Sequence, residues 1–191
     1  IYMNIKKTAN LLINFTLNRI AEIFGIIVFA SGILLMLALF TYSPEDPNFI
    51  FPDNTEIKNI LGFQGSFISD LFFQSIGLIS YLFSLTLIIS GINIFRTKEF
   101  FLFIENTFFS ILYILFGSLF FTYYYIDAFT LYINGNGGFI GSYLNESFFI
   151  SLIKFNETIS FFILIFIILF FFLISINFKP INFYNSVKKI T

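Results

Sequence analysis

Four long stretches without a single charged residue constrain the fold of this chain more than any other feature. They run over residues 23–41, 71–95, 107–126 and 158–176. A hydrocarbon core about 30 Å thick is crossed by roughly 20 helical residues, whose backbone polar groups are satisfied within the helix. Each stretch is therefore predicted to cross a membrane, and the predicted fold class is an all-α integral membrane four-helix bundle.

The composition points to lipid as the solvent of the protein. Hydrophobic residues make up 58% of the 191 residues and charged residues only 11%, too few to cover the surface of a water-soluble globule. The chain has no Cys and no His, which excludes disulfides, imidazole bases and the usual zinc ligand sets. We therefore expect no catalytic, cofactor-binding or metal site in this chain.

Nucleic-acid and nucleotide binding are also not expected of these residues. The net charge is −1, and the few basic residues are scattered instead of forming a basic stripe. The glycine-rich run 134–138 predicts a tight turn, but the spacing and the lysine of a Walker phosphate loop occur nowhere in the sequence.

The basic residues predict the orientation, because Lys and Arg in short loops stay on the cytoplasmic side. Those of the leading segment, the second gap and the tail are Lys6, Lys7, Arg19, Arg96, Lys98, Lys179, Lys188 and Lys189. The other two gaps are dominated by Asp and Glu, so both termini are predicted to be cytoplasmic. The predicted regions are a cytoplasmic segment 1–21, a membrane domain 22–178 with outer loops 42–70 and 127–157, and a cytoplasmic tail 179–191.

Small residues in the second stretch predict a helix-packing face. Helices in lipid associate by close van der Waals fit, which small side chains permit. Gly77, Ser84 and Gly91 recur every seven residues, with Ser80 between them. The expected opposing small residues are Ala21, Gly25 and Gly32 in the first stretch, and Gly117 and Ser118 in the third. A pore lined by these residues is the less favoured interpretation.

The outer loops contain turn and capping signals. Two prolines in the run 43–47 prevent the first helix from continuing. Asp53 or Asn54 is expected to cap a short helix that continues through Leu61 and ends at Gly62, and Ser66 to cap the next helix. Residues 139–155 suggest one short helix at the outer interface.

Several of these runs together resemble the N-terminal membrane domain of the FtsK/SpoIIIE family of bacterial DNA translocases. The resemblance covers about residues 20–176 and is carried by the runs Tyr42–Pro47 and Asn59–Phe73, by Gly77, and by the glycine turn 137–141. The motif residues, which are also candidates for contact with a partner, are Ser43, Pro44, Asp46, Pro47, Gly62, Gly65, Asp70, Gly137, Gly138 and Gly141. The run 154–157 departs from the family, where a glycine is common.

The resemblance implies a membrane anchor at the division septum of the bacterial inner membrane. The family's motor, which uses ATP and Mg, follows such a domain, so the chain is expected to be part of a longer protein. Division proteins are the expected partners, and homo-oligomers are expected to form through the motor. Replacing Asp46 and Asp70 by Ala is expected to impair septal recruitment without loss of insertion.

Two alternatives are weighed against this interpretation. A small four-helix transporter or channel subunit usually keeps ionisable residues at membrane depth, and the four stretches contain none. An intramembrane enzyme needs a base, a nucleophile or a metal ligand in the membrane, and the composition offers no such residue. The membrane anchor is therefore preferred.

Overall fold

The protein is described here from a computed structural model that covers residues 2–47, 56–126 and 133–179. These residues form helices and turns and contain no strand. The helical elements are α1 (Tyr2–Phe40), α2 (Gly62–Ile76), the 3₁₀ turn η1 (Gly77–Ile79), α3 (Ser80–Thr97), α4 (Phe101–Tyr124), α5 (Gly138–Asn145), α6 (Phe149–Phe155) and α7 (Glu157–Ser175). Four helical segments are long and apolar enough to cross a membrane: α1, α2 with α3, α4, and α7. The predicted all-α class is confirmed, and the described residues contain four helical segments that could cross a membrane.

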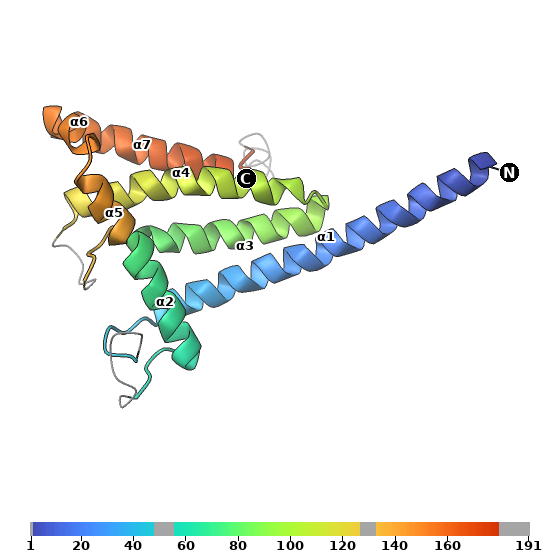
Figure 1. Cartoon of the computed structure of the whole chain (residues 1–191), viewed down its shortest axis with the longest axis horizontal. Coiled ribbons are helices and arrows are strands. Elements are labelled where there is room, and N and C mark those ends of the chain that lie inside the picture. Colours follow the sequence, from blue (N-terminus) through green and yellow to red (C-terminus); the bar gives the residue numbers. More distant parts are fainter. Residues whose placement is uncertain (1, 48–55, 127–132, 180–191) are drawn as a thin grey trace, which may run out of the picture.

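The four spans pack as two pairs of consecutive helices. α1 lies along α3, and α4 lies along α7, while α3 joins the pairs through smaller contacts with α4 and α7 (Figure 1). Within the described residues the backbone of α1 stays away from those of α4 and α7, although the ring of Phe24 in α1 meets that of Phe103 at the start of α4, with centroids 5.2 Å apart. The arrangement is therefore an open row of helices, not a closed ring. α7 is the most lipid-exposed span, with 17% of its apolar window buried.

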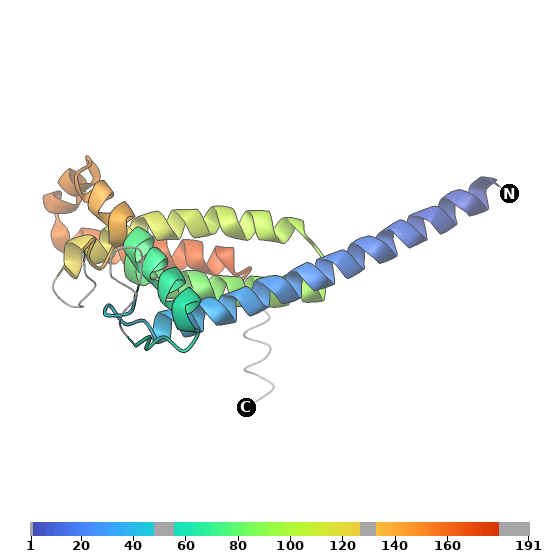
Figure 2. The ribbon, with the colours of Figure 1, turned by 60° about the horizontal axis from the view of Figure 1, so that its bottom comes forward.

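The loops divide the molecule into two ends. α2, α5 and α6 lie at one end, which we call the outer end, and the turn between α3 and α4 lies at the other (Figure 1). α1 contains 39 residues, or about 58 Å at 1.5 Å per residue, nearly twice the thickness of the hydrocarbon core. Its first turns therefore project well past the α3–α4 turn (Figure 2).

An ion pair ties the projecting helix to the α3–α4 turn. Lys98 Nζ lies 3.0 Å from Glu22 Oε1, and Arg19 also contacts this carboxylate. Lys98 has a positive φ of 63° and ends α3 in the left-handed conformation. Glu22, the last charged residue before the first predicted span, thus fixes the position of α1 beside the turn.

The second span was predicted as one helix over 71–95, and this is wrong. The structure breaks it at Gly77, whose φ of 69° and ψ of −149° are incompatible with a helix and are tolerated by glycine. The N–H of Leu78, freed by the break, donates to the carbonyl of Asn136 at 2.9 Å. Gly77 therefore does not share a helix face with Ser84 and Gly91.

Three expectations for the outer loops are also wrong. Residues 56–61 form no helix, and Gly62 begins α2 instead of ending a helix. Ser66 lies inside α2 and is not its cap; Asp53 and Asn54 lie outside the described residues. The single helix expected over 139–155 is divided into α5 and α6.

The run that departs from the family pattern starts the last span. Asn156 is extended, with φ −153° and ψ 95°, and separates α6 from α7. Its side-chain oxygen accepts a hydrogen bond from the N–H of Ile159 at 3.0 Å. An N-cap of this kind satisfies a backbone donor that would otherwise be unpaired.

Candidate functional site

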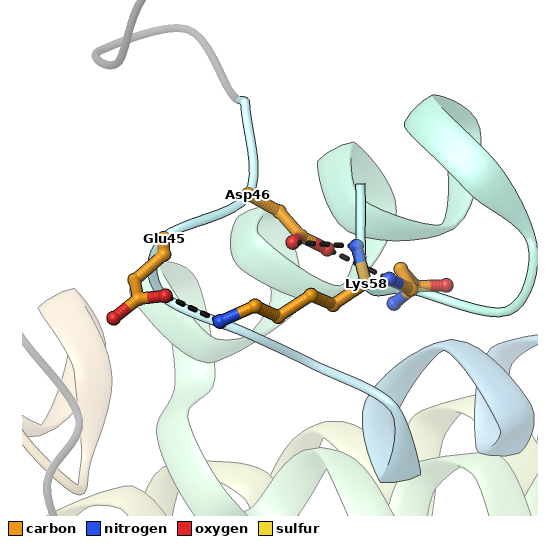
Figure 3. A network of polar contacts seen from close by, with 4 residues as sticks. Glu45, Asp46 and Lys58 are labelled. Carbon is orange, nitrogen blue, oxygen red and sulfur yellow. Dashed lines mark hydrogen bonds and ion pairs between the residues drawn. The ribbon is translucent and has the colours of Figure 1, made fainter. Parts of the chain in front are cut away.

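The polar contacts of the first outer loop are concentrated around the carboxylate of Asp46. Its Oδ1 accepts from the backbone N–H of Lys58 at 2.8 Å and its Oδ2 from that of Asn59 at 2.9 Å (Figure 3). The residue is 1% exposed. A carboxylate that binds two backbone donors in a buried position holds two distant parts of the loop together.

Asn59 extends this contact to the end of the first span. Its Nδ2 donates to the carbonyl of Ala38 at 2.9 Å and to that of Thr41 at 3.3 Å. Its Oδ1 accepts from the N–H of Leu61 at 3.1 Å. The last turn of α1 has free carbonyls by the geometry of a helix, and Asn59 satisfies one of them. We call Asp46, Asn59 and their hydrogen-bond partners the clasp.

Other motif residues of the first outer loop and of α2 pack around the clasp. Ser43 accepts from the N–H of Asp46 at 3.2 Å, closing a turn over Pro44. The carbonyl of Pro47 accepts from the hydroxyl of Ser66 at 3.2 Å. A side chain at Gly65 would place its Cβ 2.1 Å from the Oδ1 of Asn59.

Two further motif residues position α2. Gly62 has a φ of 67°, which permits the turn into the helix. About two turns further along α2, Asp70 Oδ1 accepts from the hydroxyl of Tyr42 at 3.2 Å and from Nε2 of Gln74 at 3.5 Å. Asp70 is 9% exposed. The structure thus places the carboxylates of Asp46 and Asp70 inside the fold, so they act on any partner indirectly.

An ion pair lies on the outside of the clasp. The ammonium of Lys58 contacts the carboxylate of Glu45 (Figure 3), and both side chains are mostly exposed. The hydrogen bond from Lys58 and its charge lower the pKa of Glu45 below 4.5, and the same contact raises the pKa of Lys58 above 10.5. Because both groups are solvated, the pair contributes little to stability.

The second outer loop packs its glycines into the break of the second span. A Cβ on Gly138 would lie 2.6 Å from the backbone N of Gly77, and one on Gly77 would lie 2.0 Å from the carbonyl oxygen of Asn136. A Cβ on Gly137 or on Gly141 would lie 2.0 to 2.5 Å from the carbonyl oxygen of Ser118 and from the hydroxyl of Thr122, both in α4. The four glycines let two loops and α4 meet backbone to backbone.

The residues predicted to form a helix-packing face in the second span take part in two separate contacts. A Cβ on Gly91 would lie 2.4 Å from the backbone N of Phe29 and 2.7 Å from the carbonyl oxygen of Gly25, so α1 and α3 touch here. The hydroxyl of Ser84 donates to the sulfur of Met36 on the same side. Ser80 instead donates to the carbonyls of Gly77 and Phe72 and stabilises the break.

The sequence analysis did not identify a buried polar network between α3 and α4. The hydroxyls of Thr86 and Tyr113 lie 2.9 Å apart, and Nδ2 of Asn106 donates to the hydroxyl of Ser90 at 2.8 Å. All four residues are at most 2% exposed. We call them the polar network. Asn106, Ser110 and Tyr113 recur at helical spacing on one face of α4, and this pattern could have revealed the network from the sequence.

The described residues of the candidate site offer hydrogen bonds and close packing. Among residues 2–47, 56–126 and 133–179, no three Asp or Glu residues are grouped so that they could hold a metal ion. The clasp and the glycine contacts are therefore interpreted as elements that hold the outer loops on the spans.

The comparisons with known proteins that give a match all point to the same family. Residues 18–187 match the family described as the 4TM region of DNA translocase FtsK/SpoIIIE. The DNA translocase FtsK of Pseudomonas putida is 33% identical over 82 residues, which cover 42% of this chain and 10% of that protein. The DNA translocase FtsK of Rhizobium meliloti is 33% identical over 69 residues, or 36% of this chain and 8% of that protein. No solved structure matches the chain significantly.

Proposed function

This chain belongs to the family of the 4TM region of the DNA translocases FtsK/SpoIIIE, and on that premise we propose that it anchors a DNA translocase in the membrane. The match extends over residues 18–187, hence over three candidate spans completely and over most of the first, which begins at Lys7. The aligned parts of the two relatives are a tenth of their length or less. The motor activity, its ATP and Mg, and its hexameric assembly belong to the rest of such a protein.

The proposed orientation places both termini in the cytoplasm of a bacterial cell, with the protein in the inner membrane. The start of α1, the α3–α4 turn and the end of α7 all lie at the end opposite the outer loops (Figure 1). The basic residues Arg96, Lys98 and Lys179 belong to this end, as the positive-inside rule requires of a cytoplasmic surface.

The anchor would act by confining the motor subunits to the membrane. Motor subunits held in the plane of a membrane have a higher effective concentration than free subunits, which favours their assembly into a ring. At the septum this assembly would surround chromosomal DNA during segregation. The chain itself contributes lipid contacts and no direct contact with nucleic acid.

The first outer loop is the proposed contact with division proteins. Ile57, Ile60 and Phe63 lie around the clasp and are 42%, 68% and 48% exposed. Apolar side chains held outward on a rigid loop are suitable anchors for a protein partner. Asp46 supports the proposal by fixing this loop, because its own carboxylate is buried.

The structure provides no observation that favours the transporter alternative. In the described part of the chain, the buried charged residues are Asp46 and Asp70, and both lie at the outer end. The buried groups deeper in the spans are neutral hydroxyls and amides that bind one another.

Localisation of a fluorescent full-length protein tests the anchor. Deleting the four-span domain is expected to disperse the protein and cause segregation defects, whereas the intact protein gathers at septa. Septal foci that persist without the domain would contradict the proposal. The double variant Ile60→Ser/Phe63→Ser is expected to insert normally but to be recruited poorly. Its control is Phe139→Ser/Tyr143→Ser, which changes exposed residues of the second outer loop.

A reporter fusion tests the orientation separately. Alkaline phosphatase attached after Thr191 is active only outside the inner membrane, so it is expected to be inactive. Full activity of this fusion, with an inactive fusion in the loop after Pro47, would reverse the proposed orientation.

A further inference from the structure

A cleft opens at the end of the bundle that carries the α3–α4 turn. Its volume is about 680 Å³, and its walls come from the end of α3, the start of α4 and the segment that follows α7. Ile89 and Leu102 form apolar walls, and Asn93 and Asn177 line its polar part. The cleft therefore combines an apolar interior with polar groups at the level where the second span ends.

The inner boundary of the cleft is held by side-chain amides. Nδ2 of Asn93 donates to the carbonyl of Ile176 at 3.0 Å, which joins α3 to the end of α7. Nδ2 of Asn177 donates to Oδ1 of Asn106, a member of the polar network. These contacts set the separation of α3, α4 and α7 and keep the cleft open.

The rim of the cleft carries an excess of positive charge. Arg96 and Lys179 line it together with one carboxylate, Glu99. All three residues are exposed, and none of them forms an ion pair with another described residue. Lys98, which is next to them in sequence, is already paired with Glu22. Among the described residues, two cationic groups that form no ion pair thus stand over apolar walls, with the carboxylate of Glu99 at the same rim.

We propose that this cleft binds one anionic phospholipid, with its phosphate between Arg96 and Lys179 and an acyl chain along Ile89 and Leu102. Basic pockets between spans at a cytoplasmic membrane surface suit such head groups, and guanidinium groups bind phosphate through paired hydrogen bonds. A soluble anion would use the rim alone and leave the apolar walls uncovered. The proposal depends on the proposed orientation only for the leaflet that supplies the lipid.

Native mass spectrometry of the detergent-purified chain tests the site with phosphatidylglycerol and phosphatidylcholine as probes. The wild type is expected to retain one phosphatidylglycerol in preference to phosphatidylcholine. The variant Arg96→Gln/Lys179→Gln is expected to lose this preference by about tenfold or more, since each basic group near a lipid surface contributes a factor of about five. Lys7→Gln/Lys154→Gln, which changes the net charge equally, is expected to retain it.

A second measurement locates the acyl chain. The sequence contains no Trp, so Leu102→Trp provides a single fluorophore in the apolar wall. Brominated phosphatidylglycerol is expected to quench it more than brominated phosphatidylcholine. Equal quenching, equal loss in the control variant, or inorganic phosphate that binds as tightly as phosphatidylglycerol would each overturn the proposal. None of these outcomes bears on septal anchoring, which the localisation experiments measure.

Discussion

The carboxylate of Asp46 and the backbone N–H of Asn59 are joined by a buried hydrogen bond of 2.9 Å across 13 residues of the first outer loop. Asn59 in turn donates to the carbonyl of Ala38 at the end of α1. The loop is thereby fixed to the first span before it enters α2. This contact leads to the first prediction.

Asp46→Ala is expected to destabilise the outer end by about 1–3 kcal/mol, because it leaves two buried backbone donors without an acceptor. Thermal unfolding in detergent and limited proteolysis of the first loop measure the effect. Glu45→Ala is the matched control, since this neighbouring carboxylate is exposed, and a change within about 0.5 kcal/mol is expected. Equal effects of the two variants would show that the burial of Asp46 is unimportant.

Gly91→Ala is expected to separate α1 from α3 and to destabilise the protein by about 1–3 kcal/mol, as overpacking of a tight contact does. The added Cβ would meet backbone atoms of Phe29 and Gly25, which cannot rotate away. Unfolding in mixed detergent micelles measures this loss. Ile92→Ala changes an adjacent residue that is 40% exposed and is expected to have a much smaller effect. A neutral Gly91→Ala would disprove the close contact.

Tyr113→Phe is expected to cost about 0.5–2 kcal/mol by removing the hydroxyl that contacts Thr86, within the range of hydrogen bonds between membrane helices. Asn106→Leu should cost more, because Ser90 and Asn177 both lose a partner. Thr107→Val is the control, since Thr107 is exposed and bonds only to its own helix. Unfolding curves that coincide for all three variants would exclude a role for the polar network.

The Glu45–Lys58 pair is expected to contribute to the stability of the folded loop only within a defined pH window. The pKa of Glu45 is lowered from 4.5, so its contribution is present above that value and is lost as the pH falls through the lowered pKa. The pKa of Lys58 is raised from 10.5, so its contribution is present below that value and is lost as the pH rises through the raised pKa. NMR titration of the Glu45 carboxyl carbon, before and after Lys58→Met, measures the shift. An unchanged titration in the variant would exclude the ion pair.

The sequence predicted the spans because charge-free stretches of this length have few alternatives. It also placed Gly25, Gly32 and Gly91 at helix contacts, where spacing alone is informative. It did not reveal the break at Gly77, because a glycine within an apolar stretch is equally compatible with an intact helix. The break depends on Asn136, which lies 59 residues further along the chain and meets it only in the folded protein.

The clasp shows a different limit of prediction. The run around Asp46 was recognised, but its carboxylate was assigned to a partner because exposure cannot be deduced from a loop sequence. The polar network was missed because a hydroxyl in a membrane helix can bond within its own helix, as those of Thr107 and Ser110 do. Asn106 binds Ser90 of α3, and Thr86, which also donates to the carbonyl of Leu82 in its own helix, contacts Tyr113 of α4.

The pairing of α1 with α3 and of α4 with α7 has a consequence for biosynthesis. Each pair consists of spans that leave the ribosome one after the other, so the first hairpin can complete its own tight packing while the second is still being translated. The contacts of α3 with α4 and α7, and those of the break at Gly77 with the second outer loop and α4, must wait for the later spans. We therefore expect insertion to add the two hairpins in turn, with the contacts between them made last.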